Sequence, residues 1–92
     1  MRYNGIHLTF NEHHWGVGPD AQTALRNLRK YGGRHDARRN TRYLWIFPAE
    51  SGAVWIDALG RVFWENADIE ESAIDKYVYK NGRRVRYEEV TA

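Results

Sequence analysis

Hydrophobic and polar positions follow distinct patterns along the chain, and each pattern predicts a different element. Residues 6–10 (IHLTF) alternate apolar and polar side chains, which is typical of a half-buried β-strand. Residues 11–18 (NEHHWGVG) contain Gly16 and Gly18, so we expect a connecting loop there. Residues 43–47 (YLWIF) form an unbroken apolar run that ends at Pro48, which predicts a central strand buried on both faces.

Between these strands, a helical spacing of three and four residues predicts one main helix. Pro19 and Asp20 are typical of the N-terminal end of a helix, and Gly32 and Gly33 are typical of its C-terminal end. Its buried stripe consists of Ala21, Ala24, Leu25, Leu28 and Tyr31.

The second half of the chain predicts two β-hairpins. Residues 53–56 and 62–64 flank the turn 57–60, which begins with Asp and ends with Gly. Residues 68–76 are compatible with one or two helical turns. Asn81-Gly82 then lies between two strand-like runs and predicts a two-residue type I′ hairpin. The register that this turn imposes pairs Lys80 with Arg83, Tyr79 with Arg84, Val78 with Val85 and Tyr77 with Arg86.

The predicted order, β-α-β-β-β-(short α)-β-β, indicates an α+β fold. One helix cannot cover both faces of a large sheet, so we expect a curved, mostly antiparallel sheet with one main helix packed on one face. The 92 residues leave room for one domain, residues 1–92.

Composition narrows the class of protein. Four Trp, six Tyr and three Phe among 42% hydrophobic residues supply a core and exclude a disordered chain. The absence of Cys excludes disulfides and thiolate metal sites. No apolar run is long enough for a transmembrane helix and no signal peptide is evident. We therefore expect a soluble, cytoplasmic protein that does not act at a membrane.

The net charge of +2 conceals three blocks of opposite sign. Residues 26–42 contain seven basic residues and one acid, residues 50–75 contain seven acids and one basic residue, and residues 76–87 contain five basic residues and no acid. Such blocks mark either partner surfaces or segments that neutralise one another within the fold.

The first candidate site is the last hairpin. With Val78 and Val85 directed to the core, its other face carries Tyr77, Tyr79, Arg84 and Arg86. Rings interleaved with guanidinium groups are suited to unpaired bases and phosphates. The alternative is that Tyr and Arg stack on one another across the strands of a solvated sheet.

The second candidate is the helix with the loop that follows it. Its basic residues are suited to phosphates or to an acidic protein surface, or they simply solvate the helix. We include Arg26, Arg29, Lys30, Arg34, Arg38 and Arg39, with Arg42 continuing the patch.

The remaining candidates are weaker. His7, His13, His14 and His35 match no zinc-ligand spacing, and no catalytic motif is present, so we predict no catalytic residues, metal or cofactor. Among the tryptophans, Trp45, Trp55 and Trp64 are expected in the core. Trp15 lies in the polar loop and is expected to be partly exposed, as an interface anchor.

Two functions remain, and neither is enzymatic. The favoured one is a small protein-binding module or inhibitor that acts on a partner such as a nucleic-acid-handling complex, because the net charge is low for a nucleic-acid binder. The alternative is an RNA or single-stranded DNA binding protein that uses the basic helix–loop and the Tyr/Arg hairpin. Basic blocks that merge on one face, with the acids on another, would favour nucleic acid.

Overall fold

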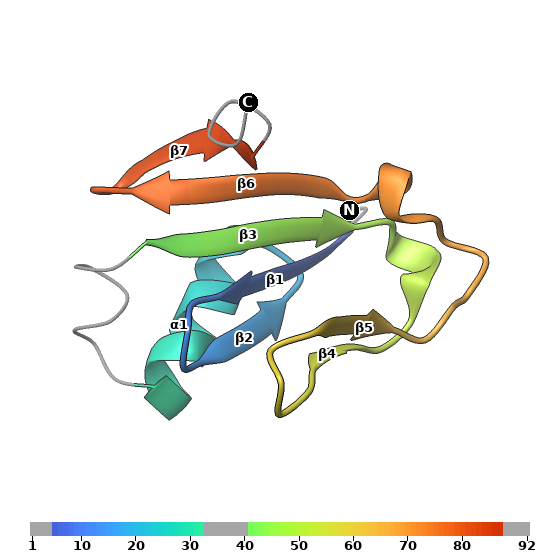
Figure 1. The fold of residues 1–92 in the computed structure, drawn as a ribbon, viewed down its shortest axis with the longest axis horizontal. Helices are drawn as coiled ribbons and strands as arrows, with labels where there is room; N and C mark the ends of the chain where they lie inside the picture. The colour runs from blue at the N-terminus through green and yellow to red at the C-terminus, as the bar shows by residue number, and fades with distance from the viewer. Residues whose placement is uncertain (1–4, 33–40, 88–92) are drawn as a thin grey trace.

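The computed structural model describes residues 5–32 and 41–87, and it confirms the α+β class (Figure 1). In the described part, five strands form one antiparallel sheet in the order β2-β1-β3-β6-β7. These strands are β1 (Ile6–Phe10), β2 (Trp15–Gly18), β3 (Arg42–Phe47), β6 (Asp75–Lys80) and β7 (Arg83–Arg86). A separate hairpin consists of β4 (Val54–Ile56) and β5 (Val62–Trp64), and the α-helix is α1 (Ala21–Gly32). The described helices include none that is long and apolar enough to cross a bilayer.

Strand register divides the sheet between two sides. His7, Thr9 and Leu44 lie on the side that α1 covers at β1 and β2, and we call this the helix side. Leu8 and Phe47 lie on the opposite side, where they form the core with residues of β4 and β5. We call this the hairpin side. The single helix thus leaves β3, β6 and β7 outside its main contacts on the helix side.

The predicted loop at residues 11–18 is wrong in its second half, because Trp15–Gly18 form the edge strand β2. The glycines that suggested a loop serve packing instead. A Cβ atom at Gly16 would overlap the α1 backbone at Ala24 and Leu28. Only a residue without a side chain allows the helix to lie this close to the strand.

The helix begins two residues later than Pro19, at Ala21, because Asp20 acts as its N-cap. The Asp20 carboxylate accepts a hydrogen bond of 2.7 Å from the Thr23 N–H, which satisfies a donor that the first turn leaves unpaired. The predicted helical turns at 68–76 shrink to the single 3₁₀ turn η2 (Glu71–Ala73), and β6 already begins at Asp75.

Both predicted hairpins are confirmed. β6 and β7 pair in the predicted register, and Asn81 (φ 52°) and Gly82 (φ 79°) adopt the two positive φ values of a type I′ turn. β4 and β5 pair through Trp55 and Phe63 and follow the 3₁₀ turn η1 (Ala49–Ser51). The predicted central strand is also confirmed, since β3 lies third in the sheet of five.

The prediction that Trp55 belongs to the core is wrong. Its side chain is 41% exposed, whereas Trp45 and Trp64 are half-buried against the core. The hairpin β4–β5 buries alternate residues, so Val54 and Ile56 face the core and Trp55 between them faces outward.

Candidate binding surface

Five side chains on the helix side of β3, β6 and β7 form a set of stacked guanidinium groups and phenol rings. We name this set the Tyr/Arg ladder. Its members are Arg42, Tyr77, Tyr79, Arg84 and Arg86, which strand pairing places on one side of the sheet. The four residues predicted from the last hairpin are therefore brought together as expected, and Arg42 joins them from the neighbouring strand.

The ladder is held together by cation–π contacts. The guanidinium carbon of Arg42 lies 3.9 Å from the centre of the Tyr79 ring, and that of Arg84 lies 3.9 Å from the centre of the Tyr77 ring. Arg86 approaches Tyr77 at 5.4 Å. Each ring therefore has one face covered by a guanidinium group of the same chain. Cross-strand stacking, the structural alternative raised by the sequence, is present.

Stacking changes what the ladder offers a ligand. The exposed groups are the planes and N–H edges of Arg84 and Arg86, which lie at the surface while the rings beneath them are half-buried. Burial lowers the pKa of Arg84, and side-chain interactions with Tyr77 and Tyr79 outweigh it, so the pKa is raised overall. The Arg84 guanidinium therefore keeps its charge while it stacks on the ring.

Arg42 is the buried end of the ladder. It is only 8% exposed, and its guanidinium donates a hydrogen bond of 2.8 Å to the Thr9 hydroxyl, which in turn donates one of 2.8 Å to the Tyr43 carbonyl. Burial lowers the pKa of Arg42, partly offset by Tyr79. Among the described residues, no carboxylate lies within 4.0 Å of it. Within residues 5–32 and 41–87, the charge of Arg42 therefore adds positive potential to this side.

The basic residues of α1 extend the same surface. Arg26, Arg29 and Lys30 are exposed, and the charge of Arg29 acts on Arg42 across the gap between helix and ladder. Strands β1 and β3 connect the two regions. The predicted residues Arg34, Arg38 and Arg39 lie outside the described part of the chain.

His7 lies where helix and ladder meet. Its strand neighbours place it on the helix side, and the charges of Asp20 and Arg84 both act on it. Burial lowers the pKa of His7, with Arg84 acting in the same direction and Asp20 opposing. The sequence had singled out His7 only as part of a histidine cluster, because the position of Arg84 depends on the sheet.

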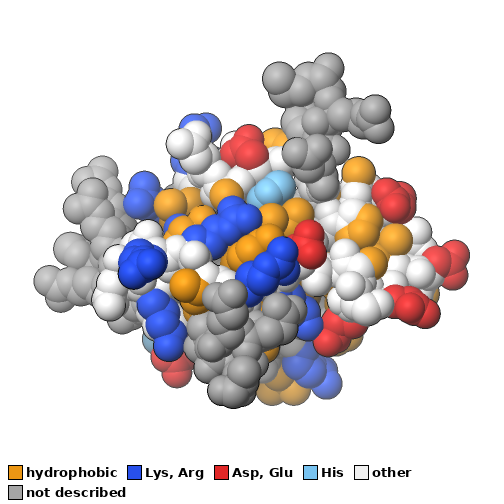
Figure 2. All heavy atoms as spheres, turned by 90° about the horizontal axis from the view of Figure 1, so that it is seen from above, with side chains coloured by type: hydrophobic (Ala, Val, Ile, Leu, Met, Phe, Trp, Pro, Cys, Tyr) orange, Lys and Arg blue, Asp and Glu red, His pale blue; other side chains and the backbone are white. Residues whose placement is uncertain are grey.

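Most carboxylates of the described residues lie elsewhere. Six of the seven in the acidic block belong to β4–β5 and the segments that join it to the sheet: Glu50, Asp57, Glu65, Asp68, Glu70 and Glu71. Figure 2, which looks from above onto the edge where β7 and β6 lie, shows blue basic side chains interleaved with orange ones in the middle and on the left, and red acidic ones mainly on the right. Within the described ranges, Asp20 and Asp75, the seventh acid of the block, border the helix side.

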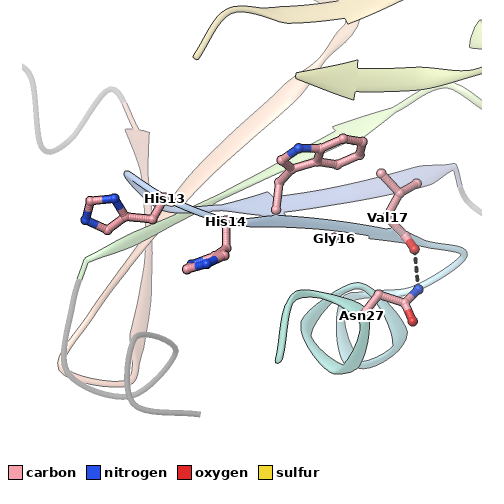
Figure 3. Close-up of a pocket in the computed structure, with 6 residues that line it drawn as sticks. His13, His14, Gly16, Val17 and Asn27 are labelled. Atoms are coloured by element: carbon pink, nitrogen blue, oxygen red, sulfur yellow. Dashed lines mark hydrogen bonds between the residues drawn. The ribbon is translucent and has the colours of Figure 1, made fainter. Parts of the chain in front are cut away.

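Trp15 is 37% exposed, as predicted, but it lies apart from the ladder on the edge strand β2. It lines a hollow of about 470 Å³ between β2 and α1. Figure 3 shows this hollow, where the Asn27 amide donates a hydrogen bond of 2.6 Å to the Val17 carbonyl. His13 and His14 lie at its rim with ring centres 6.1 Å apart. The described residues contain no group of three or more His, Asp or Glu that would hold a metal ion.

Comparison with known proteins adds no relative, since no family model, curated protein or solved structure matches this chain. The geometry of the helix side is therefore what carries the functional argument.

Proposed function

We propose that this protein binds single-stranded nucleic acid, RNA or single-stranded DNA, through the helix side of its sheet. The single observation that carries the proposal is the placement of the two basic elements. The Tyr/Arg ladder and the basic residues of α1 share one side of the sheet, and most acids of the described residues belong to β4–β5 and the segments that join it to the sheet. The sequence named this arrangement as the one that favours nucleic acid.

Chemistry supports an unpaired strand over a duplex. Guanidinium planes stack on exposed bases, and their N–H edges donate hydrogen bonds to phosphates. Arg84 and Arg86 are pre-ordered for both roles by Tyr77 beneath them. In a duplex the bases already stack on one another, so only the phosphate contacts would remain.

The test measures the affinity for a fluorescent oligonucleotide of about 15 unpaired nucleotides, a length that covers the site sizes of known single-strand binders. Titrations by anisotropy at about 50 mM and about 200 mM salt separate phosphate contacts from stacking, because only the former weaken steeply with salt. Replacing both Tyr79 and Arg84 by Ala should cost several kcal/mol, since each stacked base contributes ~1–3 kcal/mol.

Two matched variants sharpen the result. Arg84→Lys keeps the charge and removes the plane, so it should weaken binding while leaving its salt dependence unchanged. Arg61→Ala removes an arginine that pairs with Asp57 at 2.8 Å on the separate hairpin, and binding should not change. No binding at about 50 mM salt, where electrostatic attraction is strongest, would exclude the proposal.

A protein-binding module or inhibitor is the second candidate function, and the sequence favoured it. One observation supports it: β4–β5 carries exposed aromatic side chains on its outer face. These residues are separate from the helix side.

A further inference from the structure

The outer face of the hairpin β4–β5 is an exposed aromatic surface. Trp55 and Phe63 are direct partners across the two strands, with ring centres 5.8 Å apart and planes only 19° from parallel. Trp55 is 41% exposed and Phe63 is 37% exposed. At the hairpin tip, Leu59 is 78% exposed. Clustered large apolar side chains of this kind are typical of protein interaction sites.

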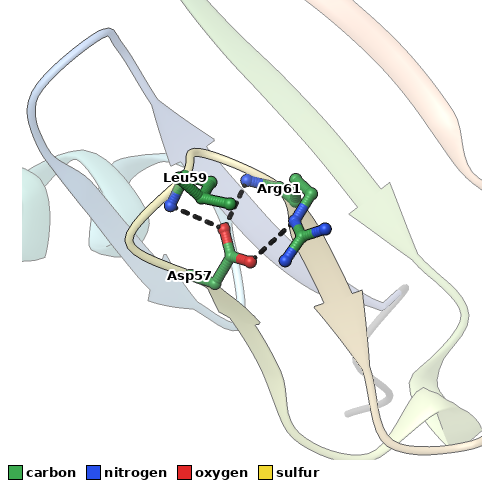
Figure 4. Close-up of polar contacts among 3 residues, drawn as sticks. All are labelled: Asp57, Leu59 and Arg61. Atoms are coloured by element: carbon green, nitrogen blue, oxygen red, sulfur yellow. Dashed lines mark hydrogen bonds and ion pairs between the residues drawn. The ribbon is translucent and has the colours of Figure 1, made fainter.

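The hairpin is rigid enough to present these side chains. Asp57 accepts hydrogen bonds from the Leu59 and Arg61 N–H groups at 3.0 and 2.8 Å and from the Arg61 guanidinium at 2.8 Å (Figure 4). The opposite face of the hairpin is anchored in the core through Val54 and Ile56. Little ordering is therefore needed on binding, which reduces the entropic cost of association.

Beside Phe63 the surface has a shallow hollow. It measures about 330 Å³ and is lined by Val62, Phe63, Trp64 and Ala67. An apolar side chain of a partner would be received there while Trp55 and Leu59 project outward. The surface therefore combines projecting anchors with a recess, as interface centres do.

Charge around the surface indicates the kind of partner. Glu65 follows Phe63 by two positions on the outer face and is exposed, and its backbone N–H pairs with the Ala53 carbonyl at 2.8 Å. Within the described residues, no cationic group lies within 4.0 Å of the Glu65 carboxylate. The backbone of Glu50 lies close to this end, because its carbonyl accepts a hydrogen bond of 3.1 Å from the Asn66 side-chain amide. The Arg61 guanidinium lies 5.6 Å from the centre of the Phe63 ring, and its charge is paired with the Asp57 carboxylate at 2.8 Å.

We propose that this surface docks a protein partner that presents apolar side chains surrounded by Lys or Arg. The aromatic pair supplies the apolar contact, and Glu65 and Glu50 attract the basic rim. A nucleic acid fits poorly, since the carboxylates repel phosphates. This inference specifies the second candidate function and uses residues distinct from the Tyr/Arg ladder, so either can fail alone.

The test uses two amphipathic peptides of about 15 residues, long enough for a helix of about 20 Å. They share the same Leu positions and carry either Lys or Glu at every polar position. Peptide binding to the full chain is followed by NMR through the Trp indole N–H signals. The Lys peptide should bind saturably and shift the Trp55 signal, whereas the Glu peptide should leave that signal unchanged.

Variants distinguish this surface from other exposed aromatics. Trp55→Ala and Glu65→Lys should each weaken Lys-peptide binding about tenfold or more, as truncation of an anchor residue does. Trp15→Ala is the matched control, because Trp15 is as exposed as Phe63 and lies on another strand. The affinity of the Trp15→Ala variant for the Lys peptide should stay within about twofold of the wild-type affinity. None of these three variants touches the ladder, so oligonucleotide affinity reports on the proposed function independently.

Three outcomes would overturn the inference. The first is that neither peptide binds at concentrations up to about 1 mM, at which even a complex with a Kd of about 1 mM would be detected. The second is that the Glu peptide shifts the Trp55 signal as strongly as the Lys peptide. The third is a concentration-dependent dimer, seen by light scattering and lost in Trp55→Ala, because a second copy of this chain would then be the occupant.

Discussion

The two hairpins of this protein, β4–β5 and β6–β7, place aromatic side chains at the surface in opposite electrostatic settings. In β6–β7 the rings are tyrosines, and guanidinium groups cover Tyr77. In β4–β5 the rings are Trp55 and Phe63, which stack on each other. Arg61, paired with Asp57, lies 5.6 Å from the Phe63 ring, and the exposed Glu65 follows two positions after Phe63. The first hairpin presents fixed positive charge, and the second presents apolar surface at an acidic end.

The difference arises from where each hairpin meets the core. β6 is an inner strand of the large sheet, so Val78 is buried and the helix side remains for charged groups. β4–β5 is a ribbon of its own, and only one of its faces has a sheet to pack on. Aromatic residues on its outer face are thus left without a partner among the described residues, apart from each other and Arg61.

The largest expected effect contrasts the two faces of the aromatic hairpin. Trp64 packs on Phe47 with ring centres 5.6 Å apart, and its indole N–H donates a 2.9 Å hydrogen bond to the Ile69 carbonyl. Trp64→Ala should lower the free energy of unfolding by about 2–4 kcal/mol, because a cavity forms and a carbonyl loses its donor. Trp55→Ala should cost less than about 1 kcal/mol.

Urea denaturation of both variants measures this contrast. Equal losses of stability would show that Trp55 supports the fold, and the argument for an outward docking surface would then fail. The difference in stability between the wild-type chain and Trp15→Ala gives the loss expected when an exposed tryptophan is removed.

A smaller effect compares the two turns. Gly60 (φ 80°) and Gly82 (φ 79°) have nearly the same left-handed backbone, and a Cβ at either position would meet no atom within 4 Å. Alanine should therefore cost about 1–2 kcal/mol at both sites, from backbone strain alone. Thermal unfolding should show losses that agree within the error of the measurement.

The functional consequences of the two glycine changes should differ. Gly82→Ala strains the turn that sets the register of Arg84 and Arg86, so oligonucleotide affinity should fall. Gly60→Ala should leave that affinity unchanged. Equal loss of oligonucleotide binding in both variants would place the nucleic-acid site outside the Tyr/Arg ladder.

Local sequence signals predicted the basic hairpin down to its residue pairs. A two-residue Asn-Gly turn fixes the register of its own strands, and side-chain alternation then follows without reference to the rest of the fold. The same reasoning failed at Trp55. Residues 54–56 are all apolar, so no period reveals which side faces outward, and the answer depends on how the ribbon packs on a distant sheet.

Long-range packing also explains the missed strand β2. Gly16 marks a close approach of α1, and only the assembled fold shows which backbone it meets. For the candidate site, the sequence supplied the basic residues but not their common surface. That surface depends on α1 lying on the same side of the sheet as Arg84, and Arg42 enters it only through pairing of β3 with β6.

The smallest expected effect is a pH dependence that belongs to the helix side alone. The pKa of His7 is lowered from its ordinary value of 6.5, chiefly by burial, with Arg84 adding to the effect and Asp20 opposing it. The unfolded chain therefore binds a proton more readily than the folded one. The stability that neutral His7 allows is complete above pH 6.5 and is lost as the pH falls below that value. The pKa values of Asp20 and Asp57 are lowered from 3.8, chiefly by backbone hydrogen bonds from Thr23 and Arg61 respectively, so their contributions are lost only in stronger acid.

Urea midpoints at about pH 7.5 and about pH 5.5 isolate the contribution of His7 to stability. His7→Gln should flatten the difference between the two midpoints, and His13→Gln, a change at an exposed histidine, should preserve it. Oligonucleotide binding should strengthen over the same range, because protonated His7 adds a positive charge beside Arg84. An unchanged pH dependence in His7→Gln would show that protonation of this side chain does not oppose folding.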